Sequence, residues 1–137
     1  ARFQRVGDDV VVDGAHIPAG AEALVETWRE AFGQTRARLV FGALRDKDDS
    51  ALLRRLREIA DEVWLVTVAN PRAVPSGELR ASAEDAGFLR VREAGVVEAL
   101  AATRAAGGPA LVAGSLFLAG EALAVLEGRT APAVSAQ

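Results

Sequence analysis

Apolar residues follow two alternating patterns along the chain: short continuous runs, and longer stretches in which they recur three or four positions apart. A short run bounded by turn residues predicts a strand buried on both faces, as in parallel sheets that helices cover on either side. The longer spacing predicts helices that bury one face. The predicted strands are residues 10–13, 39–42, 63–68, 89–91 and 110–114, and the predicted helices are residues 19–32, 52–59, 76–86, 96–106 and 115–127.

The alternation of strands and helices predicts βαβ units and a mostly parallel sheet. Near the start of the chain, residues 2–6 and 10–13 flank Gly7-Asp8-Asp9, a turn signal that predicts an antiparallel hairpin. The expected fold class is therefore α/β: a Rossmann-like, mostly parallel sheet flanked by helices, with an N-terminal antiparallel hairpin. A length of 137 residues fits one domain. We place that domain at residues 1–127 and expect residues 128–137 to be a flexible tail.

The segment from Val10 to Pro18 combines a predicted strand, a tight loop and a helix start. Pro18 suits the first position of a helix, because the N–H that proline lacks would be unpaired there anyway. Ligands of open α/β sheets bind outside the carboxyl ends of the strands, beside helix N-termini. With right-handed crossovers, one edge of the sheet collects Asp13, His16 (the one histidine), Gly42, Lys47, Thr67, Gly114 and Ser115.

Two of the predicted helices begin with residues typical of N-caps and first turns. Asp48, Asp49 and Ser50 precede the second predicted helix, and their side chains suit its cap and first turn. Ser76 is the predicted cap of the third helix, with Glu78 in its first turn. Capping therefore explains one or two of the acids that precede the second predicted helix.

Capping does not explain Lys47, because a cation near a helix N-terminus is mildly unfavourable. It is the single lysine among the sixteen Lys and Arg residues of the chain. A lysine ammonium is a compact point charge, whereas the arginine guanidinium is a wide planar fork. We interpret Lys47 as marking a position that arginine cannot fill; the alternative is that chance leaves one lysine in an arginine-rich chain.

The composition excludes several classes of function. No apolar run has the length of a membrane span, and no secretory leader is recognisable, so we expect no membrane partner and a cytoplasmic location. The absence of cysteine excludes disulfides and thiolate metal sites, and with one histidine no metal site is expected. A net charge of −3 argues against nucleic acid as the main partner. The absence of methionine indicates a piece of a longer protein.

Several motifs of nucleotide-binding proteins and hydrolases are absent. No Gly-x-Gly-x-x-Gly follows a predicted strand, and no Gly-x-x-x-x-Gly-Lys-Ser/Thr occurs, so neither the usual dinucleotide site nor a P-loop is expected. Ser115, His16 and Asp13 could be combined into a hydrolase triad, but Ser115 lacks the Gly-x-Ser-x-Gly elbow. A receiver domain fits less well, because its lysine follows a late strand and Lys47 follows an early one.

Four sequence blocks, each at a predicted strand end or the chain start, carry a family resemblance. They are Arg2-Phe3-Gln4, Asp13-Gly14-Ala15-His16-Ile17-Pro18, Phe41-Gly42-Ala43-Leu44-Arg45-Asp46-Lys47-Asp48 and Gly114-Ser115-Leu116-Phe117-Leu118-Ala119-Gly120. Over about residues 1–127 the chain resembles the carboxy-terminal domain of folylpolyglutamate synthase/dihydrofolate synthase, within the wider group of Mur-type ATP-dependent amide ligases. The chain departs from the family at Ile17, where the family usually has asparagine.

The resemblance implies an ATP-dependent acid–amino-acid ligase. In that family an acyl phosphate forms from a carboxylate and ATP, the amine of L-glutamate attacks it, and phosphate leaves. The carboxylate substrate is a folate or dihydropteroate. ATP and Mg²⁺ are bound mainly by an amino-terminal ATPase domain, on which the carboxy-terminal domain closes. The resemblance therefore implies that residues 1–127 are inactive alone and have that amino-terminal domain as their partner.

The resemblance also implies roles for five residues. Arg2 and Asp13 are the expected nucleotide-binding residues: Arg2 offers a cation to the polyphosphate, and Asp13 accepts hydrogen bonds from the nucleotide or holds Arg2 in place. His16 and Ser115 are the expected catalytic residues, which position glutamate or the tetrahedral intermediate. Lys47 is a possible contact for a phosphate or for glutamate.

Each of these roles has a structural alternative. Arg2 is then a surface residue, Asp13 a helix cap, His16 a packed loop residue and Ser115 an N-cap. Two alternatives for the whole chain also remain: a Mur-type ligase of a peptidoglycan precursor, and a non-catalytic Rossmann-like nucleotide-binding module. A binding module predicts tight binding of its ligand by this chain alone, whereas a ligase fragment predicts weak binding or none.

Overall fold

The computed structural model describes residues 2–128; the rest of the predicted tail, residues 129–137, lies outside the described part. Within residues 2–128 the chain forms one six-stranded sheet in the order β1-β2-β6-β3-β4-β5. β1 pairs antiparallel with β2, and all other neighbours in the sheet are parallel, which confirms the predicted fold class. The strands are β1 (Gln4–Val6), β2 (Val10–Val12), β3 (Ala37–Phe41), β4 (Ala60–Leu65), β5 (Arg90–Glu93) and β6 (Ala110–Ala113).

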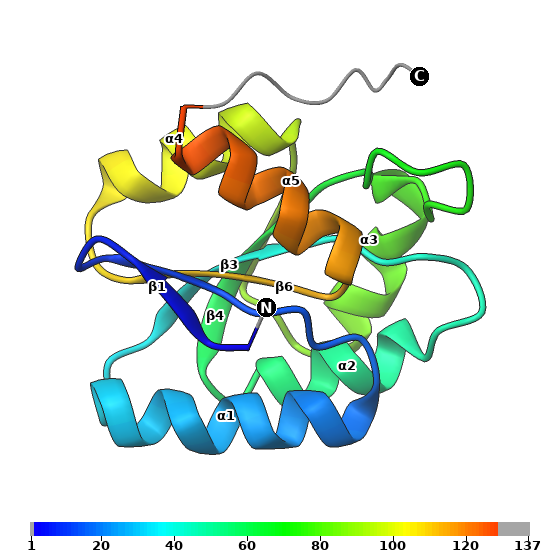
Figure 1. The fold of residues 1–137 in the computed structure, drawn as a ribbon. Helices are drawn as coiled ribbons and strands as arrows, with labels where there is room; N and C mark the ends of the chain where they lie inside the picture. The colour runs from blue at the N-terminus through cyan, green and yellow to red at the C-terminus, as the bar shows by residue number, and fades with distance from the viewer. Residues whose placement is uncertain (1, 129–137) are drawn as a thin grey trace.

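Helices cover both faces of this sheet (Figure 1). Helices α1, α2 and α3 contact one another in that order and share one hydrophobic cluster with the sheet. Helices α4 and α5 contact each other and share the second hydrophobic cluster, on the opposite face. The helices are α1 (Pro18–Phe32), α2 (Asp49–Leu56), α3 (Ser76–Asp85), α4 (Val96–Ala106) and α5 (Leu116–Leu126).

The last strand of the chain, β6, lies between the first two parallel strands, β2 and β3. The loops that leave β2 and β3 lead to α1 and α2 on one face, whereas the loop that leaves β6 leads to α5 on the other. Adjacent strand ends whose loops diverge to opposite faces leave a crevice, the topological switch point where ligands of open α/β sheets bind. The carboxyl ends of β2, β6 and β3 form this switch point.

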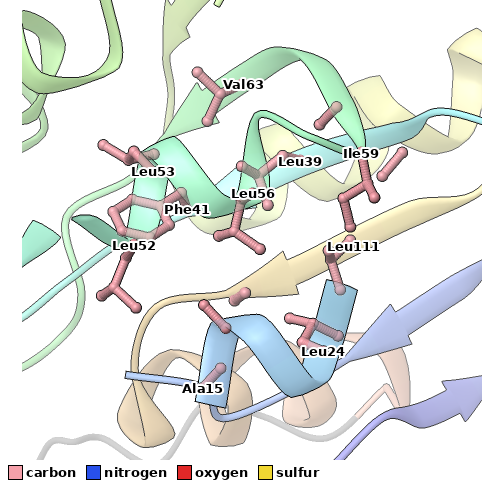
Figure 2. Packing of buried hydrophobic residues seen from close by; sticks show 14 of the residues in the cluster. Ala15, Leu24, Leu39, Phe41, Leu52, Leu53, Leu56, Ile59, Val63 and Leu111 are labelled. Carbon is pink, nitrogen blue, oxygen red and sulfur yellow. The ribbon is translucent and has the colours of Figure 1, made fainter. Parts of the chain in front are cut away.

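The hydrophobic core explains why the strands are continuous apolar runs. Val11 of β2 packs into the α1–α3 cluster, whereas Val10 and Val12 pack into the α4–α5 cluster, so all three valines are buried. Figure 2 shows the first cluster: Leu24 of α1 and the leucines of α2 meet Leu39, Phe41 and Leu111 of the sheet. Burial on both faces therefore gives the runs that the sequence shows.

Two glycines allow close approach at the carboxyl ends of the strands: Gly114 between β6 and β3, and Gly42 between β3 and the segment that follows β4. Gly114 has a φ of +120°, and a Cβ at this position would overlap the carbonyl oxygen of Gly42. A Cβ at Gly42 would lie 2.9 Å from Cγ2 of Val68 and 3.0 Å from the carbonyl oxygen of Val66. The strand ends at the switch point therefore have no room for side chains at either residue.

The prediction of a strand at residues 63–68 was wrong by three residues, because β4 runs from Ala60 to Leu65. The second and third residues of the strand are the acidic Asp61 and Glu62, which interrupt the apolar pattern by which a buried strand is recognised in the sequence. Glu62 is buried, and its carboxylate pairs with guanidinium groups of the two neighbouring strands, β3 and β5. These are Arg38, Arg90 (Nε to Oε2, 2.9 Å) and Arg92 (3.6 Å).

The prediction that Ser76 caps α3 was also wrong. The N-cap is Pro75, which has no side-chain cap, and Ser76 is the first helical residue. The Ser76 N–H finds an acceptor elsewhere, in Thr67 Oγ1 at 3.0 Å. Its hydroxyl pairs with Glu93 Oε1 at 3.1 Å, so the side chain connects α3 to β5.

Further boundaries differ from the sequence predictions, two of them for visible structural reasons. The first strand begins at Gln4 rather than at residue 2, because Phe3 has a φ of +42° that interrupts the extended chain. The second helix ends at Leu56, and Ile59 lies in the following turn with its N–H bonded to Leu56 O. Asp48 is the N-cap of this helix, as predicted, and accepts from the Ala51 N–H.

Replacement of Gly114 tests the close approach of β3 and β6. Gly114→Ala is expected to lower the free energy of unfolding by about 3 kcal/mol or more, since it combines an unfavourable φ with an overlap. The matched Gly120→Ala, in α5 with no atom within 4 Å of the added Cβ, is expected to raise it by about 0.5–1 kcal/mol. Urea denaturation measures both, and similar effects of the two variants would contradict the steric account.

Candidate functional site

Two adjoining hollows lie at the switch point. The larger has a volume of about 520 Å³, between the start of the chain, the β2–α1 loop and α1. The smaller, of about 120 Å³, lies between the ends of β3 and β6. The five predicted site residues all line one or both of them: Arg2 and Asp13 the larger, Lys47 and Ser115 the smaller, and His16 both. Thr67 and Gly42, also expected at this edge, line neither.

Asp13 is buried, and both oxygens of its carboxylate accept backbone hydrogen bonds. The Phe3 N–H donates to Oδ2 and the Ala15 N–H donates to Oδ1, each at 2.8 Å. The Asp13 N–H itself donates to Val112 O at 2.9 Å, which continues the β2–β6 ladder. Asp13 therefore joins the start of the chain to the β2–α1 loop, and it does not cap α1.

The position of Arg2 depends on this bond to Phe3. Besides the Asp13 bond, the Phe3 ring packs edge-on against Trp28 of α1, with 6.5 Å between ring centroids. These two contacts hold Phe3 in its φ of +42° and fix the residue that precedes it in the chain. The exposed Arg2 side chain consequently lies in the wall of the larger hollow.

The ring of His16 is held in one orientation. Its Nδ1 lies 2.9 Å from the carbonyl oxygen of Gly14. A carbonyl oxygen only accepts, so Nδ1 carries the hydrogen, and the Nε2 of the neutral ring is then an acceptor. His16 is half-buried and lies in the walls of both hollows, so Nε2 can accept a hydrogen bond from a ligand amine.

Ser115 is the N-cap of α5, which confirms its structural alternative. Its Oγ accepts from the N–H groups of Phe117 and Leu118 at 3.0 and 3.3 Å. The side chain is buried in the wall of the smaller hollow. The hydroxyl hydrogen is not used by the cap, so Ser115 can still donate to an anionic group.

Arg2 and Lys47 bring positive charge to the two hollows. Both side chains are exposed, and neither forms an ion pair with another of residues 2–128. Most of the arginines elsewhere in this part of the chain are paired with carboxylates, as Arg72 is with Asp46. The switch point of a protein with a net charge of −3 therefore carries two uncompensated cations.

An apolar rim formed by Ile17, Leu116 and Phe117 was not predicted from the sequence. These side chains are 49%, 54% and 56% exposed, and Leu116 and Phe117 lie in the first turn of α5. Ile17 is the N-cap of α1 and makes no side-chain cap, whereas an asparagine there could accept from the helix N–H groups. The available signal was position: Ile17 directly follows His16, and Leu116 and Phe117 are the first two residues after Ser115, each at a strand end.

The described residues contain no group suited to a metal ion. Among residues 2–128, no three histidine or acidic side chains converge on one point. Asp13, the one acid in the walls of the hollows, uses both oxygens for backbone N–H groups. None of the helices in residues 2–128 is long and apolar enough to span a membrane.

Comparison with known proteins identifies relatives. The family profile "Mur ligase, glutamate ligase domain" matches residues 1–116. The "Probable bifunctional folylpolyglutamate synthase/dihydropteroate synthase" of Halobacterium salinarum is 41% identical over 127 residues, which cover 88% of this chain and 15% of that protein. The folylpolyglutamate synthase of Lacticaseibacillus casei is 35% identical over 124 residues, which cover 87% of this chain and 28% of that protein.

A solved structure shares the fold as well. The folylpolyglutamate synthase of Mycobacterium tuberculosis, crystallised in complex with ADP and AMPPCP, superposes with a TM-score of 0.78 and 32% sequence identity. The alignment covers 89% of this chain and 30% of that chain. The chain therefore spans less than a third of each of these three relatives.

Replacement of Asp13 tests its two hydrogen bonds to backbone N–H groups. An asparagine has one acceptor oxygen, so in Asp13→Asn either Phe3 or Ala15 loses its acceptor and faces an amide donor. The free energy of unfolding is expected to fall by about 1–3 kcal/mol. In the matched Asp48→Asn the cap bond to Ala51 is retained, and the expected change is below about 0.5 kcal/mol. Denaturant titration measures both, and a neutral Asp13→Asn would contradict the assignment.

Proposed function

This chain belongs to the family of Mur ligase glutamate ligase domains, and from that premise we propose that it is the carboxy-terminal domain of an ATP-dependent ligase of the folylpolyglutamate synthase/dihydrofolate synthase type. The reaction joins L-glutamate to the carboxylate of a folate or of dihydropteroate. The observation that carries the proposal is the convergence of Arg2, His16, Lys47 and Ser115 on the hollows at one switch point. The names of the relatives supply the substrate class.

The chemistry requires charge neutralisation and positioning more than covalent participation. The acceptor carboxylate attacks the γ-phosphorus of ATP, so ADP leaves and an acyl phosphate forms. The amine of glutamate then attacks the acyl carbon, the nitrogen loses one proton as the amide bond forms, and inorganic phosphate leaves with the electrons of the broken C–O bond. Anionic oxygens are present at every stage, and unpaired cations in the walls stabilise them.

Arg2 and Asp13 serve the nucleotide. The exposed Arg2 guanidinium offers planar donors to the polyphosphate. Asp13 acts on Arg2 through the backbone of Phe3, whose N–H it binds at 2.8 Å. The ADP and AMPPCP complexes of the mycobacterial relative support a nucleotide as ligand in this family.

His16, Ser115 and Lys47 serve glutamate and the reacting carbonyl. Nε2 of His16 can accept a hydrogen bond from the attacking amine, since Nδ1 is bonded to Gly14. The Ser115 hydroxyl donates to an oxygen of the tetrahedral intermediate while its own oxygen remains the cap of α5. Lys47 provides a point charge for a carboxylate or phosphate in the smaller hollow.

The remainder of the enzyme supplies what residues 2–128 lack. These residues hold no carboxylate cluster for Mg²⁺ and no P-loop, and the chain spans 15% and 28% of two relatives. We place Mg²⁺ and most of the ATP contacts on an amino-terminal ATPase domain, and the 137-residue chain alone is then catalytically inactive. Closure of the two domains excludes water from the acyl phosphate.

The test is ADP release by the full-length protein with Mg-ATP and L-glutamate, with dihydropteroate, a reduced folate or a muramoyl-peptide precursor as acceptor. We expect stimulation by a pterin acceptor, and at least a tenfold loss of kcat/KM for Arg2→Ala. Arg104→Ala, in the last turn of α4, is the matched control and is expected to keep full activity. Stimulation by the muramoyl precursor alone would overturn the substrate class, and no stimulation would overturn the ligase function.

A further inference from the structure

The loop between β3 and α2 forms one wall of the smaller hollow through Leu44 and Lys47. Two backbone hydrogen bonds join this loop to the segment between β4 and α3. The N–H of Arg45 donates to Arg72 O at 2.8 Å, and the N–H of Val74 donates to Ala43 O at 2.9 Å. Leu44 and Ala73 thereby form an isolated antiparallel bridge, so this wall is fixed to a second loop.

That second loop, residues 69–75, is stiff. The N–H of Ala73 donates to Asn70 O at 3.0 Å, which closes a turn with Pro71 at its second position, where the fixed φ of proline suits a turn. The Asn70 side chain accepts from the Arg72 N–H at 2.9 Å. The loop is also joined to α5, because the Ala69 N–H donates to Glu121 Oε1 at 3.2 Å.

Side chains tie the two loops together directly before Lys47. The guanidinium of Arg72 pairs with Asp46 Oδ2 at 2.6 Å. Asp46 has a φ of +69°, a left-handed conformation that aspartate tolerates better than most residues and that needs support from its surroundings. Arg45 adds a two-point contact to Glu78, with both distances 3.2 Å, which raises the pKa of the Arg45 guanidinium.

The residues before and after Lys47 are consequently both held by contacts, whereas the Lys47 side chain forms no ion pair within residues 2–128. Asp46 is bound by Arg72 on one side, and Asp48 caps α2 on the other by accepting from the Ala51 N–H. These two acids, the nearest in sequence, are therefore both occupied. Lys47 forms no ion pair within residues 2–128 and lines the hollow beside His16 and Ser115.

We propose that Arg72 and Asp46 are positioning residues: they hold the backbone of Lys47 so that its ammonium can contact the anionic group of the substrate in the smaller hollow. This rests on the proposed function, in which Lys47 contacts a carboxylate or phosphate. We call the Arg72–Asp46 pair, with the Leu44–Ala73 bridge, the loop clamp. An exposed ion pair is worth little for global stability, so the clamp acts locally and its loss leaves the fold intact.

The first test uses the single lysine of the chain. A lysine-specific endoprotease cuts the 137-residue chain at one place, after Lys47, and the rate in native buffer reports local opening of the loop. Arg72→Ala and Asp46→Asn are expected to raise this rate about two- to fivefold without a change in Tm. Arg80→Ala, which breaks ion pairs to Glu84 and Glu93 outside the clamp, is the matched control and is expected to leave the rate unchanged. An unchanged rate in both clamp variants would overturn the clamp.

The second test is a double-mutant cycle with Lys47→Ala in the full-length ligase. Arg72→Ala is expected to raise the KM for glutamate or for the acceptor about two- to fivefold, with kcat within twofold of the unmodified enzyme. In the Lys47→Ala background the same substitution is expected to change neither constant, because there is no ammonium left to position. Arg72→Lys, which keeps a cation for Asp46, is expected to have a KM close to that of the unmodified enzyme.

The outcomes separate the two proposals. An equal effect of Arg72→Ala with and without Lys47 indicates a merely structural role and would overturn the positioning role. A full-length protein without ligase activity would overturn the proposed function, and the cleavage rates would then still decide whether the loop clamp exists. Faster cleavage together with coupling to Lys47 supports both.

Discussion

The carbonyl oxygen of Gly42 lies where a side chain at residue 114 would begin, and the carboxyl edge of the sheet depends on this contact. The close approach lets β6 lie between β2 and β3 to the last residue of each strand. One loop then leaves toward α5, while its two neighbours leave toward α1 and α2. The crevice between them therefore results from the packing of the strands and the directions of their loops, and it does not depend on the polar side chains that line it.

The polar residues of this crevice serve structure and site together. Asp13 uses both oxygens to join the chain start to the β2–α1 loop, and Ser115 uses its oxygen to cap α5. The groups left over are those a ligand can use: Nε2 of His16, the Ser115 hydroxyl hydrogen, and the cations of Arg2 and Lys47. The oxygens of Asp13 and Ser115 already accept hydrogen bonds from backbone N–H groups. The groups still available to a ligand are mostly donors and cations, which suits an anionic ligand.

Prediction from the sequence succeeded where a local pattern decides the structure. Helix α4 was predicted at residues 96–106 and lies there, because its apolar spacing is bounded by glycines. The strand β4 was misplaced because the charge of Glu62, near its start, is neutralised by arginines of β3 and β5. These contacts exist only in the assembled sheet. The convergence of the five candidate residues on two hollows followed from their places at strand ends and at the chain start. The bonds that fix Lys47, such as the bridge between Leu44 and Ala73, join distant parts of the chain and have no local signal.

The most direct test of the central claim is hydrogen–deuterium exchange of the full-length protein, with and without Mg-ATP and L-glutamate. The account predicts slower exchange on ligand addition in the loops that follow β2, β3 and β6, at residues 14–21, 43–51 and 114–118. It predicts no change at the opposite edge of the sheet, at residues 34–37 and 107–109. Protection confined to that opposite edge, with residues 114–118 unchanged, would contradict the assignment of the switch point as the ligand site.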